Sequence, residues 1–405
     1  MSTFAALWDS LLPIGRDPAT GGYRRFCWTP AELECRAWFE THAAERQLRV
    51  AADGNGNLFA WWDVPGGGPA VATGSHLDSV PDGGAFDGPL GVVSAFAAID
   101  ELRATGFQPA RPIVVSAFAE EEGGRFGVAC LGSRLLTGAI DPDTARGLRD
   151  GAGITFAGAM QAAGQDPARL GPDDDLLGRF AAYVELHVEQ GRALADLDAA
   201  VGLAESIWPH GRWRLDFTGR ADHAGTAKLA DRADPMLPYA HTVLAARQAA
   251  VELGTLATVG KVVAEPGAAN AVSSAVSAWL DVRAAGTSQL DATVDRVLTA
   301  AREAAQSQSV AFGWKKESVT PAVSFDAGLC GRLANALAGQ GIAAPVLPTG
   351  AGHDAGILAA RLPTAMLFVR NPTGVSHSPA EHAGPADCAA GVTALAAVLR
   401  ELAGA

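Results

Sequence analysis

Histidines and carboxylates come together at a few points of this 405-residue chain, in combinations that can bind metal ions. His76 and Asp78 are separated by one residue, Asp87 follows in a glycine-rich segment, and three consecutive glutamates occupy positions 120–122. A hydrolytic site with two metal ions needs a carboxylate that bridges the ions, terminal nitrogen and oxygen ligands, and a base for the attacking water. The pattern therefore predicts a metal-binding enzyme.

Two further histidines are candidates for the same set of ligands. His187 stands between Glu185 and Glu189 after an apolar run, and His377 lies between two serines. A lone histidine after an apolar run is more often a core residue. Buried carboxylates without a partner are costly, however, so the two neighbouring glutamates favour a functional role for His187.

Each motif also has a simpler interpretation. His76-Leu77-Asp78 alone fits a surface loop with a salt bridge, and three glutamates alone fit a solvated charged run. The glutamates directly follow the mainly apolar residues 113–119 and precede two glycines, whereas ordinary acidic runs lie on the surfaces of helices. Their position at the end of a buried strand favours a functional site.

Strands and a helix of the first part must position these side chains. Residues 70–74 form an apolar run that ends just before His76, and residues 90–103 have apolar residues at helical spacing. Residues 113–119 read as a buried strand that ends at the glutamates. Strand, helix and strand in this order predict a parallel sheet between helix layers, with ligands at the carboxyl ends of the strands.

The pattern changes from about residue 207 to alternating apolar and polar residues. The expected strands are 212–217, 255–263, 274–282 and 310–319, and the expected helices are 233–253 and 289–305. This strand–helix–strand–strand–helix–strand order matches a ferredoxin-like sandwich. We therefore expect an α/β catalytic domain with a mostly parallel sheet, formed by residues 1–206 and 321–405, into which an α+β domain of residues 207–320 is inserted. Residues 141–178 read as short helices and loops.

Composition narrows the class of protein. A chain of this length predicts two domains, and 48% hydrophobic with 19% charged residues indicates a well-folded protein. The net charge of −13 argues against nucleic acid or an anionic membrane as a partner. Five scattered cysteines without a Cys-x-x-Cys pair suggest neither a zinc ribbon nor a disulfide framework. No apolar run is long enough to span a membrane, and residues 1–16 do not read as a secretion signal, so we expect a cytoplasmic protein.

Several segments together resemble a known enzyme family. Segments 74–80 (GSHLDSV) and 84–92 (GAFDGPLGV) are similar to the di-metal aminoacylase and carboxypeptidase superfamily. Segment 185–191 (ELHVEQG) narrows the resemblance to the hydantoinase/carbamoylase family of amidases, which contains N-carbamoyl-L-amino acid hydrolases, allantoate amidohydrolases and ureidopropionases. Segments 350–355 (GAGHDA) and 376–381 (SHSPAE) also match, so the resemblance covers essentially the whole chain.

This resemblance implies a site with two divalent metal ions. Zn²⁺ or Mn²⁺ would suit the nitrogen and oxygen ligands, and Co²⁺ or Ni²⁺ would also be compatible. His76 and His187 would bind one ion. Glu122 and His377 would bind the other, and Asp87 would bridge the two.

The resemblance also implies roles beside the ligands. Spacing alone does not decide which glutamate does what, but the family motif places the ligand directly before the glycine. Glu121 would then be the general base that takes a proton from the attacking water, and Glu120 would be a neighbouring polar residue without a role in catalysis. The position of Asp78, two residues after His76, independently suits a carboxylate that orients that imidazole or a neighbouring ligand without contacting the metal.

The inserted domain would act as a lid and dimerisation domain. His223 matches a histidine that reaches the substrate carbonyl or its oxyanion, with a simple strand-edge histidine as the alternative. Asn270 and Arg283 match positions that hold the substrate carboxylate across a dimer, and a surface arginine is the alternative for Arg283. His210 would contact the substrate. His353 would line the site, unless it only starts a helix.

The expected reaction is hydrolysis of a carbamoyl or ureido C–N bond on a small carboxylate. An N-carbamoyl-L-amino acid is the first choice of substrate, allantoate the second, and an N-acyl amino acid or dipeptide the third. Where the family has Thr-Pro-Met after the His-Ala-Gly-Thr motif, this chain has Ala227-Lys228-Leu229, which puts the identity of the substrate in doubt.

Two other classes compete with this interpretation. A relative that binds without catalysis would be expected to lack ligands, but all five ligands and the base are present. A thiol hydrolase would use Cys130, but no histidine lies near it in the sequence.

Overall fold

The computed structural model describes residues 3–404, which divide into two compact units. Unit 1 contains the residues up to Glu205 and from Ser324 onward, and unit 2 is the continuous segment Ser206–Val323. The chain therefore leaves unit 1 once and returns to it once, so unit 2 is an insertion. Within the described residues, no helix has both the length and the apolar character needed to cross a membrane.

A large sheet forms the centre of unit 1, and its middle strands are parallel. Strand β3 (Ala70–His76) pairs in parallel with β4 (Ile113–Phe118) and with β5 (Phe180–Val188), and β15 (Thr364–Val369) pairs in parallel with β5. Strands β3, β4 and β15 are buried along their whole length, as expected for a parallel sheet covered on both faces. The predicted mainly parallel sheet is confirmed.

Shorter strands complete this sheet on both sides. They are β1 (Arg49–Ala52), β2 (Leu58–Trp62), β6 (Val201–Ile207), β13 (Val323–Ser324) and β14 (Val346–Thr349). The sheet order is β1-β2-β4-β3-β5-β15-β6-β13, with β14 paired to β6. The pairs β1–β2, β2–β4 and β15–β6 are antiparallel. The parallel strands thus lie in the middle of the sheet, and further strands flank them on both sides.

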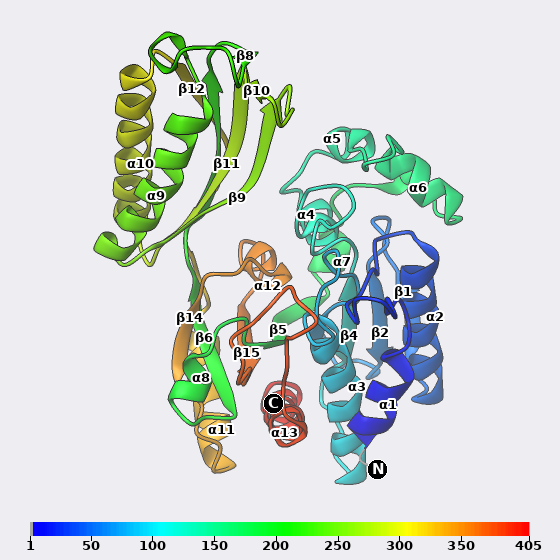
Figure 1. Ribbon diagram of the computed structural model, residues 1–405. Coiled ribbons are helices and arrows are strands. Elements are labelled where there is room, and N and C mark those ends of the chain that lie inside the picture. The colour runs from blue at the N-terminus through cyan, green and yellow to red at the C-terminus, as the bar shows by residue number, and fades with distance from the viewer. Residues whose placement is uncertain (1–2, 405) are drawn as a thin grey trace. The chain divides into compact units, whose positions relative to one another are not determined.

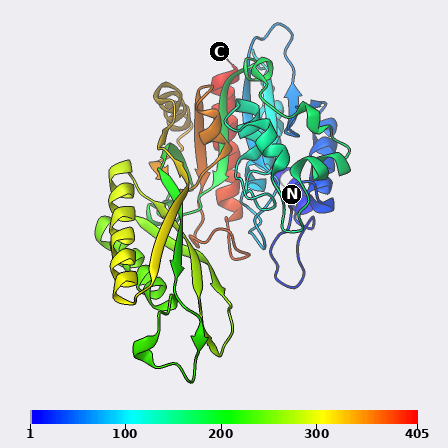
Figure 2. The same ribbon diagram turned by 90° about the horizontal axis from the view of Figure 1, so that it is seen from above.

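Long helices cover this sheet (Figures 1 and 2). Helix α3 (Pro89–Ala104) packs against α13 (Pro385–Ala403), and α1 (Thr3–Leu11), α2 (Pro30–Glu45) and α11 (Ala327–Gly339) contribute to the same hydrophobic core. Gly88 precedes α3 with a φ of 82°, a conformation that favours glycine, and a proline occupies the first turn of the helix, where its missing N–H costs nothing. The loop that carries Asp87 is therefore fixed directly to a buried helix.

The remaining helices of unit 1 are short, as expected for residues 141–178. They are α4 (Leu131–Thr137), α5 (Pro142–Gly147), α6 (Phe156–Ala162), η1 (Pro167–Arg169), α7 (Asp174–Leu177), α8 (Ala193–Asp196) and α12 (Asp354–Leu358). Helices α4, α5 and α6 bury their apolar side chains in a small core of their own with Trp28 and Phe126.

Unit 2 is a four-stranded antiparallel sheet with two helices on one face (Figure 1). Its elements are β7 (His210–Thr218), α9 (Met236–Leu253), β9 (Leu256–Glu265), β11 (Ala275–Arg283), α10 (Thr287–Ser307) and β12 (Ala311–Thr320). The sheet order β12-β7-β11-β9 and the element order give the ferredoxin-like arrangement. Two further short strands, β8 (Asp222–His223) and β10 (Ala271–Val272), pair as a separate ribbon, and a 3₁₀ turn η2 (Leu229–Asp231) follows β8.

Candidate metal centre

Strands β3 and β5 bring two histidines to the same edge of the sheet of unit 1. Gly74 of β3 pairs with Glu185 of β5, so His76 and His187, each two residues further on, lie at one level and on one face. Their ring centroids are 5.9 Å apart. His76 is also opposite Phe118, the last residue of β4, and the glutamates follow directly after that strand.

Asp87 faces both histidines. Its Oδ1 atom lies 3.4 Å from Nε2 of His76 and 3.2 Å from Nε2 of His187, and both of these nitrogens are buried without a hydrogen-bond partner. In each ring the other nitrogen, Nδ1, faces a main-chain carbonyl. Nδ1 of His76 lies 3.3 Å from the carbonyl of Asp78, and Nδ1 of His187 lies 2.9 Å from the carbonyl of Val188. Because a carbonyl only accepts, each Nδ1 carries a proton, so in the neutral ring the lone pair of Nε2 is directed toward the carboxylate.

Two acceptor atoms that face each other need a cation between them. A proton is one such cation: burial lowers the pKa of His187, but the charge of Asp87, the hydrogen bond to it and the charge of Glu185 together raise that pKa to about 9. A metal ion is the other. Ligand atoms held about 2.0–2.1 Å from one tetrahedral ion lie roughly 3.3 Å apart, close to the separations found here. The residues therefore fit a metal ion.

The second oxygen of Asp87 belongs to a second group of ligands. Its Oδ2 atom lies 3.5 Å from Nε2 of His377, which in turn lies 3.4 Å from Oε2 of Glu122. The two oxygens of Asp87 thus face different histidines, as a bridging carboxylate requires. The side chain of His377 is 51% exposed, whereas those of His76 and His187 are 1% exposed. The second group is therefore the one that opens to solvent.

Glu121 lies beside the first group of ligands. Its Oε2 atom is 3.5 Å from Nε2 of His76, and its Oε1 atom accepts a hydrogen bond of 3.2 Å from the thiol of Cys130. Burial raises the pKa of Glu121 to about 7, against the opposing charge of His76. A carboxyl with a pKa near neutral can both take up and release a proton, as a general base must.

The Cys130 thiol is poorly suited to be a nucleophile. Burial raises its pKa well above the usual value, and the charge of Glu121 raises it further. The thiol is therefore protonated at neutral pH, whereas a reactive cysteine needs its thiolate. These features argue against the thiol hydrolase that the sequence left open.

Asp78 and Glu120 hold the main chain of the glutamate segment. The carboxylate of Asp78 accepts the N–H groups of Glu121 and Glu122 at 3.2 and 3.1 Å, and it lies 3.5 Å from Nδ1 of His76. Glu120 has a positive φ of 52° and turns its carboxylate to the N–H groups of Arg125 and Phe126. Asp78 thus contacts both a candidate ligand and the base, while Glu120 points to the loop that follows.

His353 lies against His187, with the two ring centroids 4.5 Å apart. It is buried at the start of α12, its Nε2 atom has no hydrogen-bond partner, and burial places its pKa well below the usual range. His353 is therefore a neutral imidazole next to the candidate ligands. Glu185 could form a further group with these two histidines, but its oxygens already accept hydrogen bonds from Ser75 Oγ and the N–H of Ala355.

Unit 2 brings together two pairs of the predicted substrate residues. Ala271 is opposite His223 in the β8–β10 ribbon, and the carbonyl of Asn270 accepts the N–H of Ala224, so Asn270 and His223 are neighbours. The N–H of Gly225 donates to Nδ1 of His223, which leaves the proton of the neutral ring on Nε2 as a donor.

The second pair lies in the four-stranded sheet, not in the ribbon. Arg283, the last residue of β11, is opposite His210, the first residue of β7. Strand β7, which begins at His210, spans about 26 Å at 3.3 Å per residue, and the chain reaches His223 only after the far end of this strand. The thirteen-residue spacing of Asn270 and Arg283 therefore does not bring them together within one chain.

Three residues that the sequence analysis did not assign contact the candidate centre. Gln190 donates to Oδ2 of Asp87 at 2.8 Å, and Ser376 Oγ donates to the same oxygen at 3.1 Å. Glu381 accepts the main-chain N–H of Asp87. All three lie inside the segments that resemble the amidases, and this position was the only signal for them in the sequence.

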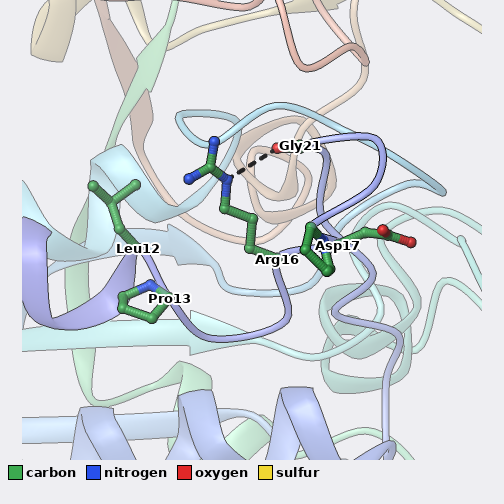
Figure 3. Close-up of a pocket in the computed structure, with 6 residues that line it drawn as sticks. Leu12, Pro13, Arg16, Asp17 and Gly21 are labelled. Carbon is green, nitrogen blue, oxygen red and sulfur yellow. Dashed lines mark hydrogen bonds between the residues drawn. The ribbon is translucent and has the colours of Figure 1, made fainter.

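A cavity of about 500 Å³ near the N-terminus contains none of these residues. Figure 3 shows its lining, including Leu12, Pro13 and Arg16, and the side chain of Arg16 donates to the carbonyl of Gly21 at 3.3 Å. Its lining offers one arginine and one aspartate but no histidine or paired carboxylate. This cavity is therefore not the candidate centre.

Comparison with known proteins identifies relatives along nearly the whole chain. A sequence model of peptidase family M20/M25/M40 matches residues 72–401. The N-carbamoyl-L-amino acid amidohydrolase of Geobacillus stearothermophilus is 34% identical over 96% of this chain and 96% of its own length. The allantoate amidohydrolase of Escherichia coli K12 is 32% identical over 97% and 96%. The crystal structure of a hydantoinase/carbamoylase family amidase from Burkholderia ambifaria has a TM-score of 0.83 at 31% identity and covers 99% of this chain and 98% of that one.

Proposed function

Since the chain belongs to peptidase family M20/M25/M40, and within it to the hydantoinase/carbamoylase amidases, we propose that it hydrolyses the carbamoyl C–N bond of an N-carbamoyl-L-amino acid. One water is consumed, and the products are the free amino acid, ammonia and carbon dioxide. The observation that carries this proposal is the arrangement of Asp87, whose two oxygens face the unpartnered nitrogens of His76 and His187 on one side and His377 on the other.

Two divalent ions would be held by the two groups of ligands. His76, His187 and Asp87 would hold the first, and Asp87, Glu122 and His377 the second. When bound, such ions polarise the substrate carbonyl and make the attacking water more acidic. Nitrogen and oxygen ligands of this kind suit Zn²⁺ or Mn²⁺, and metal availability commonly decides between them.

Glu121 moves the proton in this reaction. The oxygen Oε1 is fixed by the thiol of Cys130, which leaves Oε2 directed toward the candidate ligands. From there Glu121 accepts a proton from the attacking water and delivers it to the leaving nitrogen, which converts a poor leaving group into a neutral amine. Its pKa near 7 suits both transfers at neutral pH.

The residues of unit 2 hold the substrate. Arg283 offers a forked guanidinium to the carboxylate, and Asp281 orients it through a hydrogen bond of 2.9 Å to Nε. His223 offers its Nε2–H to the carbonyl oxygen, where negative charge develops. The His210–Arg283 pair lies at one end of β7, and the His223–Asn270 pair lies in the ribbon that the chain reaches beyond the other end of β7. A single small substrate held by both pairs must therefore receive them from two different chains.

A homodimer would meet this requirement, and unit 2 has a surface suited to form it. Strand β9 is at the edge of the sheet and, in the described part of the chain, pairs only with β11. It exposes Val262 and Val263, and helix α9, which packs on β9, exposes Leu244 and Val251 at 70% and 67%. An unpaired edge strand beside exposed apolar side chains is a common site of association.

The test is a panel of N-carbamoyl-L-amino acids and allantoate, scored by ammonia release with and without a chelator. The proposal predicts metal-dependent ammonia release with one or more N-carbamoyl-L-amino acids as the best substrates. If allantoate were hydrolysed faster, the proposed type of reaction would stand, but the proposed substrate would be allantoate. If the protein, supplied with Zn²⁺, Mn²⁺ or Co²⁺, neither retained metal nor released ammonia from any member of the panel, the proposed function would be wrong.

A further inference from the structure

Glu381 joins two loops that are almost three hundred residues apart in the sequence. Its Oε2 atom accepts the main-chain N–H groups of Phe86 and Asp87, at 3.0 and 2.9 Å. Its Oε1 atom is 3.0 Å from the hydroxyl of Ser376. One buried carboxylate thus contacts the loop that carries Asp87 and the loop that carries His377.

The same contacts reach the side chain of Asp87. Ser376 Oγ, besides contacting Glu381, lies 3.1 Å from Oδ2 of Asp87. Oδ2 is the oxygen that faces His377. Glu381 therefore acts on Asp87 through its main-chain N–H, while Ser376 lies between the two carboxylates and can give its single proton to only one of them at a time.

The absence of a side chain at Gly84 leaves room for this contact. A Cβ atom added at Gly84 would lie 2.3 Å from Oε2 of Glu381, closer than any real contact allows. The loop can therefore approach the carboxylate only because residue 84 is glycine. Glu381 itself is 4% exposed, so water does not replace it as the acceptor for these N–H groups.

We propose that Glu381 is a positioning residue of the metal centre: it fixes Asp87 relative to His377 so that the second ion, held by Asp87, Glu122 and His377, can bind. This inference rests on the two-ion site of the proposed function. Glu381 does not touch the ion or the substrate. Its contribution is to hold in place Asp87, a ligand that lies on a loop. Loss of a contact that holds a metal ligand typically weakens metal affinity about 10- to 100-fold.

A matched pair of variants separates this role from general packing. Glu381→Met keeps the length of the side chain and removes every acceptor. Glu381→Gln keeps a carbonyl oxygen for the two N–H groups and turns its amide to Ser376 Oγ, whose proton remains free for Asp87. Gly84→Ala disturbs the same contact from the other side without changing Glu381. Each variant is checked for folding by circular dichroism.

The measurement is the number of Zn²⁺ ions bound per chain and their affinities, obtained by competition with a chromophoric chelator. Glu381→Met and Gly84→Ala should weaken the second ion about 10- to 100-fold and leave the first nearly unchanged, while Glu381→Gln should resemble the wild type. If Glu381→Met does not fold, Gly84→Ala carries the test.

Two results would contradict the inference, and they differ from a failure of the proposed function. Wild-type affinity for the second ion in Glu381→Met or Gly84→Ala would show that Glu381 does not position Asp87. Equal losses in Glu381→Gln and Glu381→Met would show that hydrogen-bond acceptance is not what matters. If the wild-type chain itself did not bind two ions, the two-ion site would be wrong, whatever the variants did.

Discussion

The separation of the two substrate pairs in unit 2 leads to a test by mixed dimers. We consider a dimer in which one chain carries His223→Ala and the other carries Arg283→Ala. If a site uses its own Arg283 and the partner's His223, one of the two sites keeps both residues and the other loses both. The reason for this division between chains is that β7, about 26 Å long, lies between the His210–Arg283 pair and the ribbon with His223 and Asn270.

The expected magnitude follows from counting sites. Each homodimeric variant should lose most of its activity, because every site lacks one group. The mixed dimer, purified through two different affinity tags, should regain about half of the wild-type activity, since a symmetric dimer has two sites and one of them is intact. Activity is measured as ammonia release at saturating substrate and metal.

A control variant tests whether loss of an arginine beside Asp281 is harmful in itself. Arg212 is opposite Asp281 on β7 and lies 3.4 Å from its carboxylate, so Arg212→Ala removes a similar contact outside the proposed pairs. It should retain wild-type activity. The reasoning is refuted if the mixed dimer is as inactive as the two homodimers, because both pairs would then serve a site from the same chain.

Three further predictions follow from the centre itself. Glu121→Gln should lower kcat about 10²- to 10⁴-fold while metal content stays at the wild-type level, and loss of metal instead would make Glu121 a ligand. Cys130→Ser keeps a hydrogen-bond donor to Glu121 and should retain activity. Complete loss of activity in this variant would instead support a thiol mechanism. When a chelator keeps the protein free of metal, the protonated His187 beside Asp87 should stabilise the fold. This stabilisation should be fully present below pH 6.5 and should be lost as the pH rises through about 9. The melting temperature of the metal-free protein should therefore fall over that range more steeply than that of His187→Asn, and parallel curves would contradict the assignment.

The parallel part of the sheet could be predicted from the sequence because its strands are buried on both faces. Residues 70–74 and 113–119 are continuous apolar runs, and both are strands whose carboxyl ends carry candidate site residues. Before His187 the sequence shows only an apolar run, whereas the strand β5 extends over Phe180–Val188 and contains His187. The polar residues Glu185 and His187 alternate with apolar ones there, so the end of the apolar run did not mark the end of the strand.

Contacts between distant loops could not be predicted from one sequence. Glu381 and Asp87 are both visible as carboxylates, but nothing in either segment indicates that a main-chain N–H of one loop meets the side chain of the other. The resemblance placed Asn270 and Arg283 across a dimer, but their thirteen-residue spacing did not show how far apart they lie in one chain. Strand β11 (Ala275–Arg283) is extended and separates Arg283 at its end from Asn270, which precedes its start.

The proposed reaction depends most directly on two ions bound together at Asp87. The decisive measurement is the rate of ammonia release from an N-carbamoyl-L-amino acid, followed while the metal-free chain is titrated with Zn²⁺ or Mn²⁺ and the bound metal is counted. We expect negligible activity without metal and full activity only when two ions are bound per chain. Full activity with no ion or with a single ion per chain would contradict the two-ion centre.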